Sequence, residues 1–480
     1  MRRSLLVAVS IVVSLLPTPS SAQDANLPER ARAGLRKACG FFRDKVTTEG
    51  GYLWRYSADL ARREGESKAS TSQVWVQPPG TPSVGEAWLD AFHATGDRFY
   101  LDGAVATAHA LVRGQLISGG WDYSIEFDPA KRKNVAYLVD NNRTGKKNVS
   151  TLDDDTTQAA LRFLMNIDHT LQRKDAKVKD AADYALTQLA KTQYPNGAWP
   201  QRFSEPPDPA KFPIKKASYP EKWSREYPAK DYRGYYTFND NSIATMIDTM
   251  LLAARIYDEP RYRQLAARAG DFMILAQMPE PQPGWAQQYD MNMHPEWARK
   301  FEPPAVTGSE SQGVMRSLLK IYAETGDKKY LEPIPRALAY YRKSLLPDGR
   351  LARFYELKTN RPLYFTKKYE LTYKDDDLPT HYGFKVGHKL DQIAKEYDRL
   401  AKLSPAELQK KRPPERPKVT EALVAQVEGV LKSLDADGRW VDAGKLRYQG
   451  PDDTTERIID VATFSRNVAI LSRFLAAVRK

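Results

Sequence analysis

The 480-residue chain contains a single cysteine, Cys39, so it can form no internal disulfide and offers no cluster of thiolates for a metal. Beyond the N-terminal segment, no stretch approaches the about 18 uninterrupted apolar residues expected of a membrane-spanning helix. The sequence therefore predicts a soluble product without a membrane span, stabilised by a packed core.

The N-terminal segment has the composition of a secretory signal. Arg2 and Arg3 precede the apolar stretch LLVAVSIVVSLL, which is followed by the small residues Ser20, Ser21 and Ala22. The apolar stretch is too short to span a bilayer comfortably. We expect residues 1–22 to be removed and the mature protein to be secreted or periplasmic.

Positive charge is in excess, with 73 Lys and Arg against 60 Asp and Glu, a formal net charge of +13. Such an excess raises the local concentration of anions. Nucleic acid is not an expected partner outside the cytoplasm, so an acidic polysaccharide is the better candidate. We expect the protein to be a monomer.

Four segments of the chain share one layout: a polar turn, an amphipathic helix, a tight turn and a second helix. The tight turns fall at Asp97, near Asp175, at Asp258 and at Asp327, about 70 to 80 residues apart. Recurrence at a fixed interval indicates supersecondary units that share one core. The sequence predicts an all-α fold, an (α/α) toroid-like barrel of repeated helical hairpins, complete or incomplete, with long irregular loops at one rim.

The expected domain organisation follows from this layout. Residues 1–22 form the signal peptide, and residues 23–403 form the toroid. The Pro- and Lys-rich stretch 404–418 is expected to be an exposed linker. Residues 419–480 contain a last helical pair that we expect to pack on the same toroid.

Two polar turns that precede successive first helices resemble each other: Thr-Leu-Asp-Asp-Asp-Thr at 151–156 and Thr-Phe-Asn-Asp-Asn-Ser at 237–242. Helix capping explains one polar residue per turn. It does not explain consecutive aspartates, whose like charges repel unless a cation lies between them. Oxygen ligands without histidine or cysteine suit Ca²⁺, and Asp153, Asp154 and Asp240 could converge on one ion. Capping combined with a solvated acidic turn remains the alternative.

Aromatic residues stand beside these turns, among them Trp199 and Tyr236. Exposed rings near glycine turns can stack on sugars, although a Trp next to Gly is as often a plug in a hinge. Together with Arg202, Arg299, Arg353 and a candidate cation, these rings favour a groove for acidic sugars.

The motifs TLDDDTT, NGAWPQRF, YYTFNDNS, GWAQQYD, ARKFEPPAVTGSES and ARFYEL occur in this order between about residue 81 and about residue 370. In this order they resemble the pectic acid lyases of polysaccharide lyase family 10. The most specific of them is the run A-R-x-F-E-x-P-x-x-x-G-x-E-S.

The resemblance implies an (α/α) toroid-like fold and Ca²⁺-assisted β-elimination of polygalacturonate, giving 4,5-unsaturated oligogalacturonides. It implies that Arg299 is the base that removes the C5 proton, and that Asp153, Asp154 and Asp240 hold calcium and the substrate carboxylate. The substrate-binding residues expected from the resemblance and from the motifs are Trp199, Arg202, Tyr236, Asn239, Glu302, Arg353, Arg361 and Lys367.

Two departures from the family pattern stand out. The family usually has Asp-Asn-Gly where this chain has Asp153-Asp154-Asp155, so the site is more acidic here. After RPLYF the family tends to Asp-Arg-Asp-Gly, whereas this chain has Thr366-Lys367-Lys368-Tyr369. Lys367 would then offer a point charge in place of a bidentate guanidinium.

Other functions remain open at the level of the sequence. Arg299 could be a structural clasp with Glu302 or Glu310. Asp154 and Asp240 could be the acid and base of a toroid glycoside hydrolase. A non-catalytic protein that binds acidic glycans would share the groove, and Asp153-Asp154-Asp155-Thr156 also resembles the acid motif of toroid terpene cyclases.

Overall fold

The computed structural model describes residues 26–410 and 416–479. The predicted signal peptide lies outside this part of the chain, so its assignment stays a prediction. The domain boundaries likewise remain predictions.

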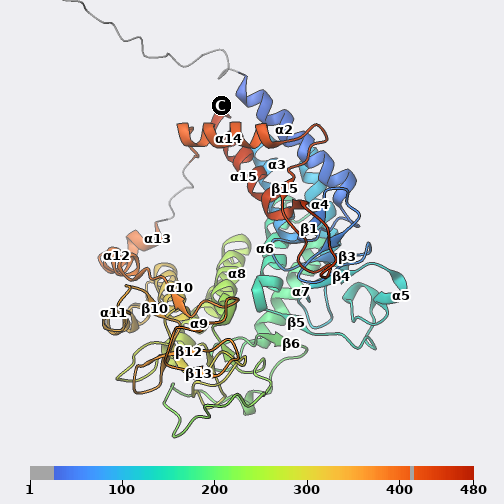
Figure 1. Cartoon of the computed structure of the whole chain (residues 1–480). Helices are drawn as coiled ribbons and strands as arrows, with labels where there is room; N and C mark the ends of the chain where they lie inside the picture. The colour runs from blue at the N-terminus through green and yellow to red at the C-terminus, as the bar shows by residue number, and fades with distance from the viewer. Residues whose placement is uncertain (1–25, 411–415, 480) are drawn as a thin grey trace, which may run out of the picture.

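Helical hairpins dominate the described chain (Figure 1). The first helices of the four hairpins are α3 (Thr81–Thr95), α6 (Thr156–Thr170), α8 (Ser242–Tyr257) and α10 (Glu310–Thr325). The second helices are α4 (Arg98–Gly114), α7 (Ala176–Thr192), α9 (Pro260–Leu275) and α11 (Pro333–Lys343).

The tight turns inside the hairpins follow from glycine and aspartate. Gly96 ends α3 with φ 74°, a left-handed conformation that glycine adopts without strain. Asp97 then caps α4 by accepting from the backbone N–H of Phe99, and Asp175 caps α7 in the same way. Asp258 differs, because it ends α8 in the left-handed region and does not cap α9.

The first helices lie side by side in one row. α3 packs on α6, α6 on α8 and α8 on α10, while α4, α7 and α9 form a second row against them. The row continues into α15 (Val461–Val478) beyond α3 and into α12 (Leu390–Ala401) beyond α10. Figure 1 shows this row as an arc that does not close on itself. The all-α, incomplete toroid predicted from the sequence is therefore confirmed.

The last helical pair packs beside the first helices of the chain. α14 (Glu421–Ser433) and α15 both contact α2 (Leu27–Phe41), and α15 also packs along α3. By length and composition α15 is the one described helix apolar enough to cross a membrane, with a mean hydropathy of 1.3. Its packing on α2, α3 and α14 accounts for that apolar character. The remaining helices are α5 (Pro129–Arg132) and α13 (Pro405–Gln409), and the single-turn or π-helical segments are η1 (Phe42–Val46), η2 (Leu138–Asp140), η3 (Asp153–Asp155), η4 (Pro209–Lys211), η5 (Asn239–Asn241) and η6 (Lys328–Tyr330).

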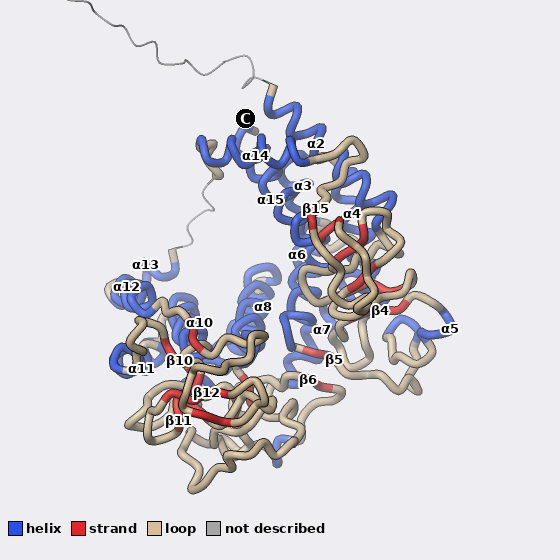
Figure 2. The backbone as a smooth tube through the Cα atoms, in the orientation of Figure 1, coloured by secondary structure: helices blue, strands red, loops and turns tan. Residues whose placement is uncertain are grey.

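Short strands, which were not predicted, tie the rim loops together (Figure 2). One four-stranded sheet has the order β15-β16-β1-β2, and a second has the order β13-β12-β11-β9. The other strands form pairs: β3 with β4, β5 with β6, β7 with β8, and β10 with β14. Their bounds are β1 (Arg55–Ser57), β2 (Arg63–Glu64), β3 (Gln73–Trp75), β4 (Ser124–Glu126), β5 (Ser150–Thr151), β6 (Arg202–Phe203), β7 (Tyr236–Thr237), β8 (Gln288–Tyr289), β9 (Ala305–Thr307), β10 (Leu351–Ala352), β11 (Phe354–Glu356), β12 (Pro362–Phe365), β13 (Leu371–Thr372), β14 (Lys385–Val386), β15 (Asp442–Ala443) and β16 (Arg457–Asp460).

A buried tryptophan packs at the end of three of the four hairpins. Trp121, Trp199 and Trp285 are all buried. Each indole N–H donates to a backbone carbonyl near the end of the preceding helix, at Leu111, Leu189 and Met273 respectively, over 2.7 to 2.8 Å. These rings therefore belong to the repeat itself.

Candidate active site

The two polar turns at the rim have the same backbone. In η3, Asp154 and Asp155 have φ values of 48° and 61°, and in η5, Asp240 and Asn241 have 48° and 57°. The threonine that opens each turn accepts from the backbone N–H two residues on, at 3.1 Å in the first turn and 3.0 Å in the second. Asp154 and Asp240 thus occupy equivalent positions, and Asp153 corresponds to Asn239.

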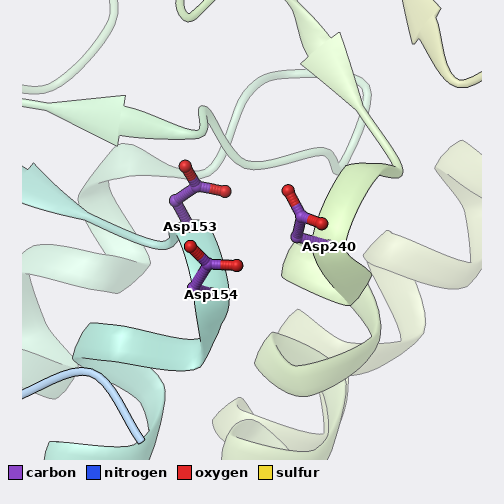
Figure 3. A group of neighbouring side chains, drawn as sticks. All are labelled: Asp153, Asp154 and Asp240. Carbon is purple, nitrogen blue, oxygen red and sulfur yellow. The ribbon is translucent and has the colours of Figure 1, made fainter. Parts of the chain in front are cut away.

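The structure brings three carboxylates from these turns together. Asp153, Asp154 and Asp240 each offer an oxygen atom, and these atoms lie within 4.8 Å of one another. Figure 3 shows Asp153 and Asp154 facing Asp240 across the space between the two turns. The convergence arises because α6 and α8 are neighbours in the row, so the turns η3 and η5 that precede them come into contact.

The protein surrounds this aspartate cluster with hydrogen-bond donors. Tyr123 Oη and Gln201 Nε2 donate to Asp153 over 2.8 and 2.9 Å, and Gln77 Nε2 donates to Asp154 over 2.9 Å. The side-chain amide of Asn239 donates to Asp240. These contacts fix the orientation of all three carboxylates.

Crowding of like charges makes the cluster a poor place for three anions alone. Burial raises the pKa of Asp154 to about 6, and the charge of Asp153 adds to that effect. Burial, followed by the charges of Asp153 and Asp154, also raises the pKa of Asp240. A divalent cation would remove this repulsion, and carboxylate oxygens are the ligands that Ca²⁺ prefers. The residues present therefore fit calcium.

The third consecutive aspartate, Asp155, does not join the cluster. Its carboxylate forms a bidentate ion pair with Arg162 of α6, at 2.5 and 2.9 Å. Arg162 also donates to Thr249 of α8, so this pair ties two neighbouring helices together.

Arg299, in the loop before β9, lies close enough to the aspartate cluster for its charge to act on it. Its charge acts on both Asp154 and Asp240, lowering the pKa of each against the larger effects that raise it. The Arg299 side chain is 40% exposed, and two of its nitrogens donate to the buried carboxylate of Glu302 over 2.9 and 2.6 Å. The clasp with Glu302 considered at the sequence level is therefore present.

This clasp sets the protonation of both partners. Burial lowers the pKa of Arg299, but the hydrogen bonds and charge of Glu302 outweigh it, so the net pKa lies above the usual range. Burial raises the pKa of Glu302, and the bonds from Arg299 reverse that effect, so the net pKa is lowered. In this geometry the pair is ionised.

A second arginine lies close by. Arg353 pairs with Glu310, the first residue of α10, over 2.6 Å, and both side chains are largely buried. The ring of Tyr382 lies near both guanidinium groups, with its centroid 4.4 Å from Arg353 and 5.6 Å from Arg299. The Tyr382 hydroxyl donates to Glu302 over 2.8 Å, so one tyrosine contacts both arginine systems.

Arg202 and Asn239 also border the cluster. Arg202 lies 3.8 Å from Asp153 and donates to the Tyr123 hydroxyl over 3.1 Å. Asn239 is buried, and its Oδ1 accepts no hydrogen bond from the described residues.

Trp199 and Tyr236 are corrections to the sequence analysis. Trp199 is 1% exposed and Tyr236 is fully buried, so neither ring presents a face to a sugar. Trp199 is one of the repeated plugs, and Tyr236 packs edge-to-face against Tyr194 in the core. The proximity to glycine turns in the sequence reflected hinge packing.

Arg361 and Lys367 also lie apart from the cluster. The Arg361 guanidinium stacks 3.4 Å from the ring centroid of Tyr373, and Lys367 pairs with Asp377 over 3.2 Å. Within residues 26–410 and 416–479, neither side chain contacts an aspartate of the cluster.

Four residues at the site were not singled out from the sequence. Tyr123 and Gln201 stand inside the motifs GGWDY and NGAWPQRF, where their polar side chains were a usable signal. Gln77 and Tyr382 lie in segments without any motif, and only the fold brings them to the site.

The loop between β6 and β7 spans the two halves of the site. Its Ser224 carbonyl accepts from the indole of Trp297 over 2.8 Å, and its Arg225 pairs with Glu356 of β11 over 2.6 Å. Trp297 stands two residues before Arg299. The loop that joins the Arg202 strand to the Asp240 turn is thus fastened to the arginine turn.

One family model covers most of the segments that build this site. The family model of pectic acid lyase matches residues 115–351, which include both turns and Arg299. Arg353, Arg361 and Lys367 lie beyond the matched range. No curated protein sequence matches the chain.

Among solved structures, the chain is similar to a family 10 polysaccharide lyase from Cellvibrio cellulosa, with 20% identity over 67% of this chain and 98% of that chain, at a TM-score of 0.45. A mutant of that enzyme in complex with trigalacturonic acid matches with 19% identity over 66% and 98% of the chains, at a TM-score of 0.45. A D-mannose isomerase matches with 13% identity over 82% and 100%, at a TM-score of 0.42. These TM-scores are low, so the description of the fold rests on the packing of the helices in this chain and not on these similarities.

The aspartate turns, the arginine turn and the intervening motifs all fall within one family match. Through residues 115–351 the chain is a member of the pectic acid lyase family, and so a polysaccharide lyase.

Proposed function

We propose that the protein cleaves polygalacturonate by calcium-assisted β-elimination, with Arg299 as the base, and releases 4,5-unsaturated oligogalacturonides. The observation that carries this proposal is the convergence of Asp153, Asp154 and Asp240 within 4.8 Å, opposite an arginine whose charge acts on two of them. A single uronate residue bound between the aspartate cluster and Arg299 would contact both.

The chemical difficulty is the C5 proton, which lies next to a carboxylate. Its removal concentrates negative charge on a group that is already anionic. Calcium held by Asp153, Asp154 and Asp240 would supply an electrostatic partner for that carboxylate. Arg299 takes the C5 proton, the electron pair forms the C4–C5 double bond, and the bond from C4 to the glycosidic oxygen breaks. The leaving oxygen takes its proton from solvent.

Glu302 has two effects on Arg299. Its bidentate grip, supported by Tyr382, fixes the guanidinium in one orientation, as a proton acceptor requires. The same grip raises the pKa of Arg299, so the neutral form needed for proton removal is scarce. We therefore expect the rate to rise with pH into the alkaline range.

Arg202 and Arg353 are the proposed contacts for uronate carboxylates next to the cleaved bond. Arg202 is partly open to solvent beside Asp153. Arg353 is held by Glu310, and its Nε has no partner among the described residues. Arginine binds carboxylates with two parallel hydrogen bonds, which fixes their orientation.

Export and the monomeric state are part of the same proposal. The positively charged, apolar and small-residue regions of residues 1–22 support secretion or transfer to the periplasm. N-terminal sequencing of the exported protein should begin near Gln23, and its size in gel filtration should match one chain.

The decisive experiment uses the purified protein, polygalacturonate and the ultraviolet absorbance of unsaturated uronate. We expect product in the presence of calcium, none after chelation, and recovery when calcium is restored. New reducing ends without unsaturation, insensitive to chelation, would instead favour hydrolysis by Asp154 and Asp240. Binding of polygalacturonate without any turnover would favour a glycan-binding protein.

A further inference from the structure

Two hollows lie next to each other beside the aspartate cluster. The first, of about 770 Å³, is lined by residues that include Arg202, Lys211 and Arg233. The second, of about 650 Å³, is lined by residues that include Lys131, Lys146 and Lys147. Asp122 and Val149 line both, so the hollows share a wall.

This shared wall connects directly to the proposed catalytic centre. Asp122 precedes Tyr123, whose hydroxyl donates to Asp153, and Val149 precedes β5, which leads into the same turn. At the other end of the first hollow, Arg202 lies 3.8 Å from Asp153. A chain leaving the aspartate cluster past Arg202 would enter these hollows.

Three lysines of the second hollow, Lys131, Lys146 and Lys147, form what we call the lysine track. All three are exposed, and none pairs with a carboxylate within residues 26–410 and 416–479. Their backbone is held in place. Lys131 stands in α5, which is capped by Asp128, and Lys147 donates its N–H to Asn134 and accepts at its carbonyl from Ala136.

Most of the acidic groups around the hollows are engaged. Asp231 is clasped by Arg233, Asp208 caps a turn, and Glu126 is buried and accepts from the N–H of Asp128. The remaining carboxylates are Asp122, which lines the same hollow as the three lysines, and the exposed Glu205, which lines only the first hollow. The lysine track therefore presents positive charge to whatever fills the second hollow.

We propose that the lysine track binds galacturonate residues of a long, unesterified polygalacturonate chain, beyond the residues seated at the aspartate cluster. The inference rests on the proposed function for its choice of polyanion. Free carboxylates are required because a methyl ester has no charge for a lysine to attract. Short oligomers bound at the cluster do not reach the lysine track.

The test compares long polygalacturonate with trigalacturonate on the full chain. In the variant Lys146→Ala/Lys147→Ala, the affinity for the long polymer should fall about five-fold, with the affinity for the trimer unchanged. The difference should shrink as salt is added, because exposed charges are screened. In the variant Asp122→Asn, the affinity for the long polymer should rise, since a negative charge is removed from the wall.

The matched control is Lys402→Ala/Lys432→Ala, which removes two exposed lysines distant in sequence from the hollows and should leave both affinities unchanged. Binding is measured by calorimetry in an Arg299→Ala background, so the result does not depend on turnover. Equal loss for polymer and trimer, or equal loss in the control variant, would overturn the lysine track. Absence of unsaturated product from the protein with Arg299 intact, together with intact binding of the polymer, would overturn only the proposed lyase reaction.

Discussion

The two rim turns, η3 and η5, share one backbone conformation but present different side chains to the site. The first turn presents Asp153 and Asp154 to the site, whereas the second presents Asn239 and Asp240. A glutamine stands beside each turn, and the two glutamines differ in their side-chain contacts. Gln201 donates to Asp153, whereas the side chain of its counterpart Gln287 has no partner among the described residues.

This difference separates the scaffold from the site. The capping threonine and the left-handed residues recur before α6 and α8, and the buried tryptophan recurs in three of the four hairpins. The difference that matters for the cluster is in the side chains that face the neighbouring turn. The side chains proposed to function are therefore those that differ between the repeated turns, and the following variants change these side chains.

The largest effect is expected from Arg299, which faces one aspartate of each turn. Replacing Arg299 with Ala should lower kcat about 1000-fold, the usual scale for a general base. Rates of unsaturated product formation measure this. The conservative variant Arg299→Lys should keep calcium binding, and full activity in both variants would rule out the base.

Removing one carboxylate of the aspartate cluster should impair the site almost as severely. Asp240→Asn should weaken calcium binding by about 100-fold, because the ion loses a charged ligand. Calorimetric titration with calcium reads this out without substrate. Asp155→Asn is the matched control, since Asp155 pairs with Arg162 outside the cluster. Similar losses in both variants would mean that the aspartates do not act as one ligand set.

Giving the second turn the acidic side chain of the first should reveal the repulsion between the clustered carboxylates directly. Asn239→Asp replaces a buried donor to Asp240 with a carboxylate, which should destabilise the calcium-free protein by about 1–2 kcal/mol. Added calcium should restore the loss. Urea unfolding with and without chelator measures both. Asn241→Asp, at the exposed position equivalent to Asp155, should change stability by less than about 0.5 kcal/mol.

The smallest effect concerns pH. The pKa of Asp154 is raised from 3.8 to about 6 in the folded protein, so the folded state binds more protons than the unfolded state between these values. The calcium-free protein should therefore become less stable as pH rises from about 4 to about 6. Calcium should weaken or reverse this trend, because it binds the ionised form. Thermal unfolding across this range checks the sign, and the variant Asp154→Asn should show a smaller dependence on pH than the unmodified protein.

The sequence was sufficient for the parts of the molecule that repeat. Helical periodicity, the Gly-Asp turns and the paired acidic motifs predicted the hairpins and placed Asp153, Asp154 and Asp240 on neighbouring turns. The sequence-based prediction failed for side chains whose exposure is decided by tertiary packing. Trp199 and Tyr236 look like sugar platforms in the sequence, and only packing reveals that they are covered.

Contacts between distant segments were also out of reach. Gln77 and Tyr382 reach the site from positions far from its motifs, and the short rim strands form from loops whose pairing depends on the toroid. The substrate contacts that the family resemblance implies for Arg361 and Lys367 stay predictions, since the contacts of these residues with Tyr373 and Asp377 do not test them.

The long loop from β6 to β7 is fastened through Ser224 to Trp297, in the segment that carries Arg299, and through Arg225 to Glu356 of β11. Any insertion or deletion within it would shift Arg202, the Asp240 turn and the arginine turn at the same time. Related enzymes with loops of other lengths would thus differ in the spacing between proton acceptor and ion, and a single surface segment could retune the reaction without altering a helix.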